Sequence, residues 1–253
     1  MTEKIEPTLD ITGLGTILGV WAHPDDEAYL SGGLMAIARD AGARVACVTA
    51  TRGERGTPDP VAWPPEGLAA AREAELACSL HVLGVTEHEW LGYPDGGCAK
   101  VPPDEAVARL CDVIDRVRPD TVVTFGPDGY TGHPDHQAVS AWTCGAFREA
   151  APAGARLLHA AVTHGWARAW STIHRELDVF QDGYPSTVDD ERIAVELVLD
   201  DRTLDRKVRA LAAQVSQTSG LIARLGMRRY KRWVGQESFV EGTRVRSTAG
   251  AWS

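Results

Sequence analysis

Two short segments concentrate the residue types that bind metal ions and transfer protons. "VWAHPDDE" spans 20–27 and "GPDGYTGHPDH" spans 126–136, and each contains the tripeptide His-Pro-Asp. Imidazole nitrogens and carboxylate oxygens are normal zinc ligands, and catalytic zinc sites use three protein ligands and keep one position open. A cation would also offset the repulsion among crowded carboxylates. The segments offer these groups: His23, Asp25, Asp26, Glu27, Asp128, His133, Asp135 and His136.

Helix capping is the alternative explanation of both segments. Asp residues are frequent at helix N-termini, and acids in the first turn complement the helix dipole. For either segment alone, the two explanations are equally good. Two His-Pro-Asp segments, each placed after an apolar run and before a helical pattern, favour metal chemistry.

Apolar runs and helical patterns alternate through the first two thirds of the chain. The patterns predict strands over 15–22, 44–51, 87–93, 120–126 and 156–164, and helices over 28–42, 66–84, 104–119 and 135–151. This order predicts an α/β fold, a Rossmann-like parallel sheet flanked by helices on both faces. Because ligands bind beyond the carboxyl ends of parallel strands, both His-Pro-Asp segments should open onto the same edge of the sheet.

The alternation ends at about residue 165. Beyond it, the sequence predicts one strand near 193–199 and one helix over 201–217. The sequence contains neither a linker composition nor an internal repeat. We therefore predict one domain over 1–253, with an N-terminal extension at 1–14 and a C-terminal elaboration on the substrate side from about 165 to 253.

Composition limits the classes of partner. Among 253 residues, 35 Asp and Glu outnumber 26 Lys and Arg, and the net charge of −9 opposes binding to nucleic acid or to an anionic membrane. Five cysteines without C-x-x-C spacing indicate free thiols in a reducing compartment. The polar N-terminus is not typical of a signal peptide, and no apolar run approaches the ~20 residues of a membrane span. We expect a cytoplasmic protein with a small-molecule partner, and homo-oligomer formation stays open.

Five motifs together carry a resemblance to a known family. They are "AHPDDE" (22–27), "TRGERGT" (51–57), "AREAELACSLHVLGV" (71–85), "LGYPDGG" (91–97) and "HPDH" (133–136). In these motifs, which lie within about 15–145, the chain resembles the LmbE-like or PIG-L family of zinc-dependent N-acetylglucosaminyl deacetylases. The resemblance implies Zn²⁺ as cofactor and hydrolysis of an N-acyl group, in the first place N-acetyl, on an N-acetylglucosamine-type sugar conjugate.

The resemblance also implies roles for the paired motifs. His23, Asp26 and His136 would be the zinc ligands, and Asp25 would be the general base. His133 would stabilise the developing oxyanion, and Asp135 would orient a histidine. These roles agree with general chemistry, because zinc lowers the pKa of bound water to about 7 and a nearby carboxylate can accept its proton.

Two further residues are implied to bind substrate. Arg72 in "AREAE" and Asp95 in "YPDGG" correspond to groups near the sugar in relatives, with a surface ion pair and a turn-forming Asp as their alternatives. The chain departs from mycothiol-pathway members at Thr131, where they have tyrosine, and from many relatives at Gln214, where they have histidine. Neither departure touches the implied ligands, but both leave the substrate open.

Three functions compete at this point. The first is the N-deacetylase, and the second is an amidase that removes a larger N-acyl group from a thiol conjugate or a glycosylated secondary metabolite. The third is a non-catalytic sugar-binding protein with a structural metal. Structural zinc sites are usually closed by four ligands and often use cysteine, so three ligands without cysteine favour catalysis.

Overall fold

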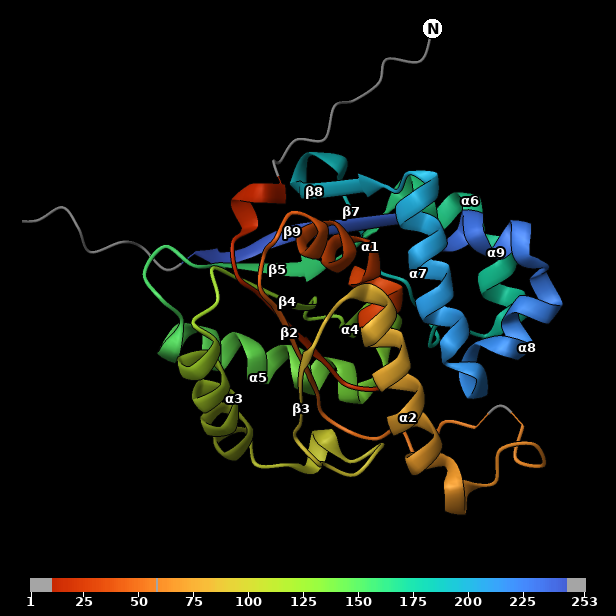
Figure 1. The fold of residues 1–253 in the computed structure, drawn as a ribbon, viewed down its shortest axis with the longest axis horizontal. Coiled ribbons are helices and arrows are strands. Elements are labelled where there is room, and N and C mark those ends of the chain that lie inside the picture. Colours follow the sequence, from red (N-terminus) through yellow and green to blue (C-terminus); the bar gives the residue numbers. More distant parts are fainter. Residues whose placement is uncertain (1–10, 58, 245–253) are drawn as a thin grey trace, which may run out of the picture.

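A seven-stranded sheet forms the centre of the molecule (Figure 1) in the computed structural model, which describes residues 11–57 and 59–244. The strands lie in the order β3-β2-β1-β4-β5-β9-β8. The five strands β1 to β5 are parallel, as predicted. They are β1 (Ile17–Trp21), β2 (Val45–Thr49), β3 (Glu87–Trp90), β4 (Thr121–Phe125) and β5 (Arg156–Ala160).

Helices cover both faces of this sheet. Figure 1 shows α3 and α5 on one side and α1, α2 and α7 on the other. The predicted α/β fold is confirmed. The helices of the first two thirds are α1 (Asp26–Asp40), α2 (Pro65–Leu83), α3 (Pro103–Val117), α4 (Gly129–Gly132) and α5 (Pro134–Ala150), with short 3-10 turns at η1 (Ile11–Leu14) and η2 (Cys98–Lys100).

The central strands explain where the two motif segments meet. Every residue of β1, β2 and β4 is buried, as expected of parallel strands covered by helices on both faces. β1 pairs with β4, with Ile17 opposite Thr121. The chain segments that follow these two strands therefore leave the sheet side by side, at the same edge.

The C-terminal third differs from the prediction, because part of it completes the central sheet. Strand β9 (Gln236–Arg244) pairs antiparallel with both β5 and β8 (Ile193–Val198). Strand β9 and the helices over 164–177 and 227–234 were not predicted. The other elements are β6 (Val162–Thr163), α6 (His164–Leu177), β7 (Thr187–Val188), η3 (Asp190–Arg192), α7 (Asp201–Ala213), α8 (Val215–Leu225) and α9 (Met227–Val234).

The single helix predicted over 201–217 is wrong. Gln214, with φ −92° and ψ 60°, interrupts it and separates α7 from α8. The Gln214 side chain is buried, and its Nε2 donates to Glu27 Oε1 at 2.9 Å. Helices α6, α8 and α9 gather next to α7 beyond one end of the sheet (Figure 1).

A buried ion pair joins α1 to this C-terminal part. Lys207 Nζ lies 2.7 Å from Glu237 Oε1, and both side chains are almost fully enclosed. Lys207 also donates to the carbonyl of Tyr29, while Glu237 accepts from the backbone N–H groups of Gly33 and Leu34 at 2.6 and 2.8 Å. The pair thereby fixes α1, which starts at Asp26 in the first His-Pro-Asp segment.

Two predictions concern parts of the chain that are described only in part. Positions 1–10 of the predicted N-terminal extension and 245–253 of the predicted elaboration lie outside the described residues. Within 11–57 and 59–244, no helix combines the length and the apolar character that crossing a membrane requires.

Candidate active site

Ligand atoms of three side chains converge where the chain leaves β1 and β4, and each histidine faces a different carboxylate oxygen of Asp26. His23 Nδ1 lies 3.1 Å from His136 Nε2 and 3.6 Å from Asp26 Oδ2, and His136 Nε2 lies 3.5 Å from Asp26 Oδ1. Ligands at 2.0–2.1 Å in a tetrahedron are about 3.3 Å apart. The spacing of these atoms therefore fits a small divalent cation such as zinc.

The outer ring nitrogens of both histidines have acceptors, which directs the inner nitrogens to the same point. His23 Nε2 faces Asp95 Oδ1 at 3.2 Å and Asp135 Oδ2 at 3.3 Å. His136 Nδ1 faces the carbonyl oxygen of Gly129 at 3.0 Å. A proton on each outer nitrogen leaves a lone pair on His23 Nδ1 and on His136 Nε2, as in histidines that ligate metals.

The charges around these atoms suit a cation. Burial lowers the pKa of His136 to about 4, so its imidazole is neutral at physiological pH. Burial opposes protonation of His23, but hydrogen bonds to Asp135, Asp26 and Asp95 hold its pKa well above the usual value. Although burial also opposes ionisation of Asp26, the neighbouring His136 and the hydrogen bonds and charge of His23 hold the pKa of its carboxyl at about 2. Three carboxylates around one histidine thus leave an excess of negative charge.

Asp25 adopts a backbone conformation that is rare for residues other than glycine. Its φ of 104° and ψ of −30° lie in the left-handed region, which points to local strain at this position. The buried carboxylate of Glu27 accepts the Asp25 backbone N–H at 2.9 Å and supports this turn. Burial raises the pKa of the Asp25 carboxyl to about 7, against the opposing charge of Arg72. Such a value suits proton exchange near neutral pH.

Arg72 lies beneath the site instead of on the wall of the pocket described below. Only 3% of the residue is exposed, and its guanidinium donates to the carbonyls of Gly53 and Pro24. Its NH2 group lies 3.5 Å from Asp25 Oδ2. A Cβ atom at Gly53, where φ is +64°, would lie 2.1 Å from the guanidinium, so only glycine fits there. The implied contact with substrate remains a prediction, whereas the contact with Asp25 is direct.

Two carboxylates hold the loop after β3 against the site. Asp135 accepts the backbone N–H groups of Gly96 and Cys98 at 2.7 and 3.0 Å in addition to facing His23. Asp95 accepts the backbone N–H of Arg55 at 2.7 Å and is only 6% exposed. Asp135 and Asp95 thus make the same kind of contact with His23. The implied roles of Asp135 in orienting a histidine and of Asp95 in binding substrate remain predictions.

His133 lies beside the converging ligands. Its Nδ1 accepts the backbone N–H of Asp135 at 3.1 Å, which caps α5 and leaves the Nε2–H group as a donor. Its ring centroid is 4.9 Å from that of His23 and 5.1 Å from that of His136. One ring nitrogen of each of these three histidines lies within 4.8 Å of the others. His133 is therefore placed either to contact a bound carbonyl or to act as a further metal ligand.

The two departures from the family pattern also have places in the structure. Tyr130 and Thr131 both line the pocket, and Thr131 Oγ1 lies 3.2 Å from His136 Nδ1. Gln214, by contrast, contacts Glu27 from below the site and does not reach the ligand atoms.

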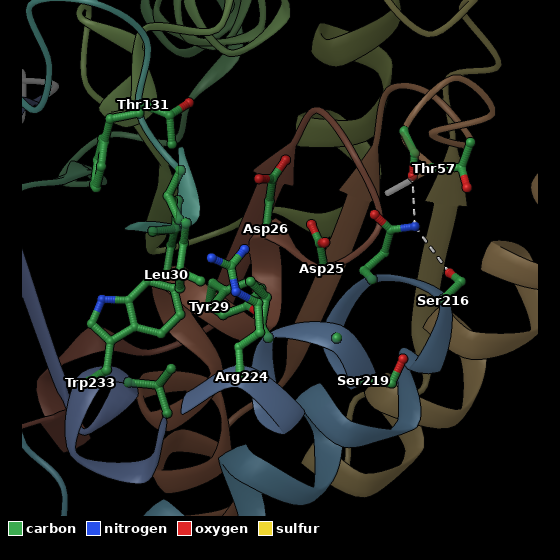
Figure 2. A pocket seen from close by; sticks show the side chains of 18 of the residues that line it. Asp25, Asp26, Tyr29, Leu30, Thr57, Thr131, Ser216, Ser219, Arg224 and Trp233 are labelled. Carbon is green, nitrogen blue, oxygen red and sulfur yellow. Dashed lines mark hydrogen bonds between the residues drawn. The ribbon is translucent and has the colours of Figure 1, made fainter. Parts of the chain in front are cut away.

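A cavity of about 840 Å³ opens from Asp25, Asp26 and His136. Figure 2 shows the two acids between a polar side, with Thr57, Ser216 and Ser219, and a side with Tyr29, Leu30 and Trp233. Many of its walls come from α6, α8, α9 and the loop after α6. The sequence patterns missed these residues, because aromatic and serine side chains without a motif signal neither a pocket nor its direction.

Comparisons with known proteins identify the family of this chain. Residues 18–147, just over half of the chain, match the family described as PIG-L, GlcNAc-PI de-N-acetylase. A 1D-myo-inositol 2-acetamido-2-deoxy-alpha-D-glucopyranoside deacetylase of Kineococcus radiotolerans is 37% identical over 191 residues, which are 64% of this chain and 53% of the relative. The deacetylase of the same name from Acidothermus cellulolyticus is 34% identical over 236 residues, covering 80% of this chain and 79% of the relative. The match thus spans about half the length of the first relative.

Solved structures share the fold. A conserved protein of Thermus thermophilus has a TM-score of 0.61 and 26% identity over 94% of this chain and 99% of its own. The N,N'-diacetylchitobiose deacetylase of Pyrococcus horikoshii also has a TM-score of 0.61, with 21% identity over 92% of this chain and 87% of its own. The family match and the Acidothermus relative confirm the resemblance seen in the motifs: the chain belongs to the PIG-L family.

Proposed function

We propose that this protein is a zinc-dependent hydrolase that removes the N-acetyl group from an N-acetylglucosamine-type sugar conjugate. One observation carries the proposal: ligand atoms of His23, Asp26 and His136 converge within 3.6 Å of one another, beside Asp25 and at the cavity. The deacetylase names of the two curated relatives support the type of reaction.

The residues around the converging ligand atoms have separate roles in amide hydrolysis. His23, Asp26 and His136 would hold the zinc ion, which would supply a Lewis acid that lowers the pKa of water and polarises a carbonyl. The Asp25 carboxylate accepts a proton from the attacking water and returns it to the sugar nitrogen as the C–N bond breaks. Water oxygen ends on the acyl carbon, so the products are acetate and the free amino sugar. The Nε2–H of His133 donates to the carbonyl oxygen as negative charge develops there.

Removal of the metal tests the proposal directly. Dialysis of the protein against a chelator should abolish release of acetate from N-acetylglucosaminyl-inositol and related conjugates, and stoichiometric Zn²⁺ should restore it. Metal content and acetate are measured on the same samples. Full activity in a sample without bound metal would refute the metal-dependent reaction, and restoration by Fe²⁺ better than by Zn²⁺ would correct the choice of metal.

The role of His133 is tested by its replacement. His133→Ala should lower kcat by about 10²–10³-fold, the usual effect of losing one oxyanion donor. Bound zinc should stay near one equivalent, because His23, Asp26 and His136 remain. Loss of the metal in His133→Ala would instead make His133 a ligand and overturn its assignment as the oxyanion donor.

A further inference from the structure

The cavity beside the candidate metal ligands has two chemically different sides. Figure 2 places Asp25 and Asp26 between them, and Arg224, which donates to the carbonyl of Glu176, is drawn next to Tyr29 and Leu30. The polar side carries Thr57, Ser216 and Ser219. The lining residues Trp63 and Asp59 lie beside Thr57, since Thr57 donates to the carbonyl of Trp63 and the N–H of Trp63 donates to the carbonyl of Asp59. The apolar side, which we call the apolar arm, is lined by Leu30, Trp166, Leu177, Val179, Phe180 and Trp233.

The apolar arm begins at the metal-binding motifs. Tyr29 follows Asp26 by three positions, and its ring centroid is 5.9 Å from that of Trp233. Tyr130 belongs to the second His-Pro-Asp segment, and its ring centroid is 6.1 Å from that of Phe180. An apolar group that enters the arm is therefore attached close to the point where the amide carbon would lie.

Buried contacts hold the arm in a fixed shape. Trp233 Nε1 donates to Nε2 of His174 at 3.3 Å, and His174 is only 8% exposed. The His174 ring also packs against Trp166 and Phe180, with centroids 4.8 and 4.7 Å away. Since these aromatic walls are positioned before a ligand arrives, binding to them loses little conformational freedom.

The scissile bond decides which part of a substrate occupies each side. Sugar hydroxyls need hydrogen-bond partners, which the polar side offers, and an aglycone is joined to that sugar. Only the acyl chain lies across the scissile C–N bond from the sugar. The cavity volume of about 840 Å³ falls in the range of pockets for drug-sized ligands.

We propose that the apolar arm accepts an N-acyl chain longer than acetyl, so that amino sugars with a medium-length aliphatic amide are substrates of the same site in addition to N-acetyl conjugates. This inference rests on the proposed function. The balanced reaction is the same: water adds its oxygen to the acyl carbon, the C–N bond breaks, and a proton moves to the departing nitrogen. The products are a medium-chain carboxylate and the free amino sugar.

A series of amides tests the inference on the zinc-loaded full-length protein. Methyl glycosides of N-acetyl-, N-butanoyl- and N-hexanoylglucosamine are compared by release of the free amine. Each methylene buried on the wall is worth up to about fourfold in binding, so kcat/KM for the hexanoyl amide should exceed that for acetyl at least tenfold. Val179→Trp, which fills the arm, should lower this hexanoyl-to-acetyl ratio at least tenfold. Trp90→Ala, a control on β3 outside the cavity, should not change it.

A binding measurement separates this inference from catalysis. Asp25→Asn protein should bind the hexanoyl amide at least tenfold more tightly than the acetyl amide in calorimetry. Hydrolysis of the acetyl amide without a gain for longer chains would overturn the acyl arm and leave the proposed function intact. A gain from an alkyl aglycone in place of an alkyl acyl chain would overturn it as well. If the protein hydrolyses none of these amides, the proposed function is refuted, and the inference is refuted with it.

Discussion

Asp25→Asn should lower kcat for amide hydrolysis by about 10²–10⁴-fold, the usual contribution of a positioned general base. An amide cannot accept the proton that the Asp25 carboxylate takes from water. The exchange keeps the shape of the side chain, and asparagine tolerates the left-handed φ of 104° found at this position. The backbone hydrogen bond to Glu27 is also kept, because it uses the N–H of residue 25. Turnover and metal content are measured together.

The metal content of Asp25→Asn and the activity of a control variant decide how the loss of turnover is interpreted. Bound zinc should remain, because the converging atoms belong to His23, Asp26 and His136. Asp178→Asn is a matched control, since Asp178 is also a non-glycine residue in the left-handed region, with φ 52°, but is exposed. Its activity should match that of the unchanged protein. Near-normal turnover of Asp25→Asn with zinc bound would exclude Asp25 as the base.

Glu237→Gln should lower the free energy of unfolding by about 3–5 kcal/mol, the range found when one partner of a buried ion pair is removed. The Lys207 ammonium would keep its charge in an enclosed site without the carboxylate now 2.7 Å away. The backbone N–H groups of Gly33 and Leu34 now donate to the two different oxygens of the Glu237 carboxylate. A glutamine amide has only one oxygen, so one of these donors would lose its acceptor. Urea denaturation followed by circular dichroism measures the change.

An exposed pair provides the control for this effect. Glu87 pairs with Arg44 at 2.7 Å, but both side chains are more than two fifths exposed. Glu87→Gln should therefore cost less than about 1 kcal/mol. Equal losses for Glu87→Gln and Glu237→Gln would contradict a special contribution of the buried pair.

The convergence of His23, Asp26 and His136 could be expected from sequence because the signals of the two segments are local. Each His-Pro-Asp segment follows a strand that reads as a continuous apolar run, and parallel strands bring such ends to one edge. Nothing local reports that Arg72 is buried. A helical arginine looks the same in sequence whether it faces solvent or two backbone carbonyls, so its position depends on tertiary packing.

The C-terminal third was harder to predict for a related reason. Strand β9 reverses direction to pair between β5 and β8, and no periodicity in one sequence specifies a partner so far along the chain. The break between α7 and α8 has no Gly or Pro to mark it. Instead, Gln214 leaves the helical conformation, and its side chain donates to Glu27 in another part of the molecule. The pocket walls depend on both features, which is why they were missed.

The chain separation of the candidate ligands links metal binding to folding. His23 and His136 are 113 positions apart and approach within 3.1 Å only because β1 and β4 are paired. An unfolded chain cannot present that arrangement, so an ion held there binds the native state alone. By mass action, free metal at about 1,000 times its dissociation constant would add about 4.1 kcal/mol to native stability. The concentration of free metal in the cell would then determine the fraction of the protein that is folded, as well as the fraction that is active.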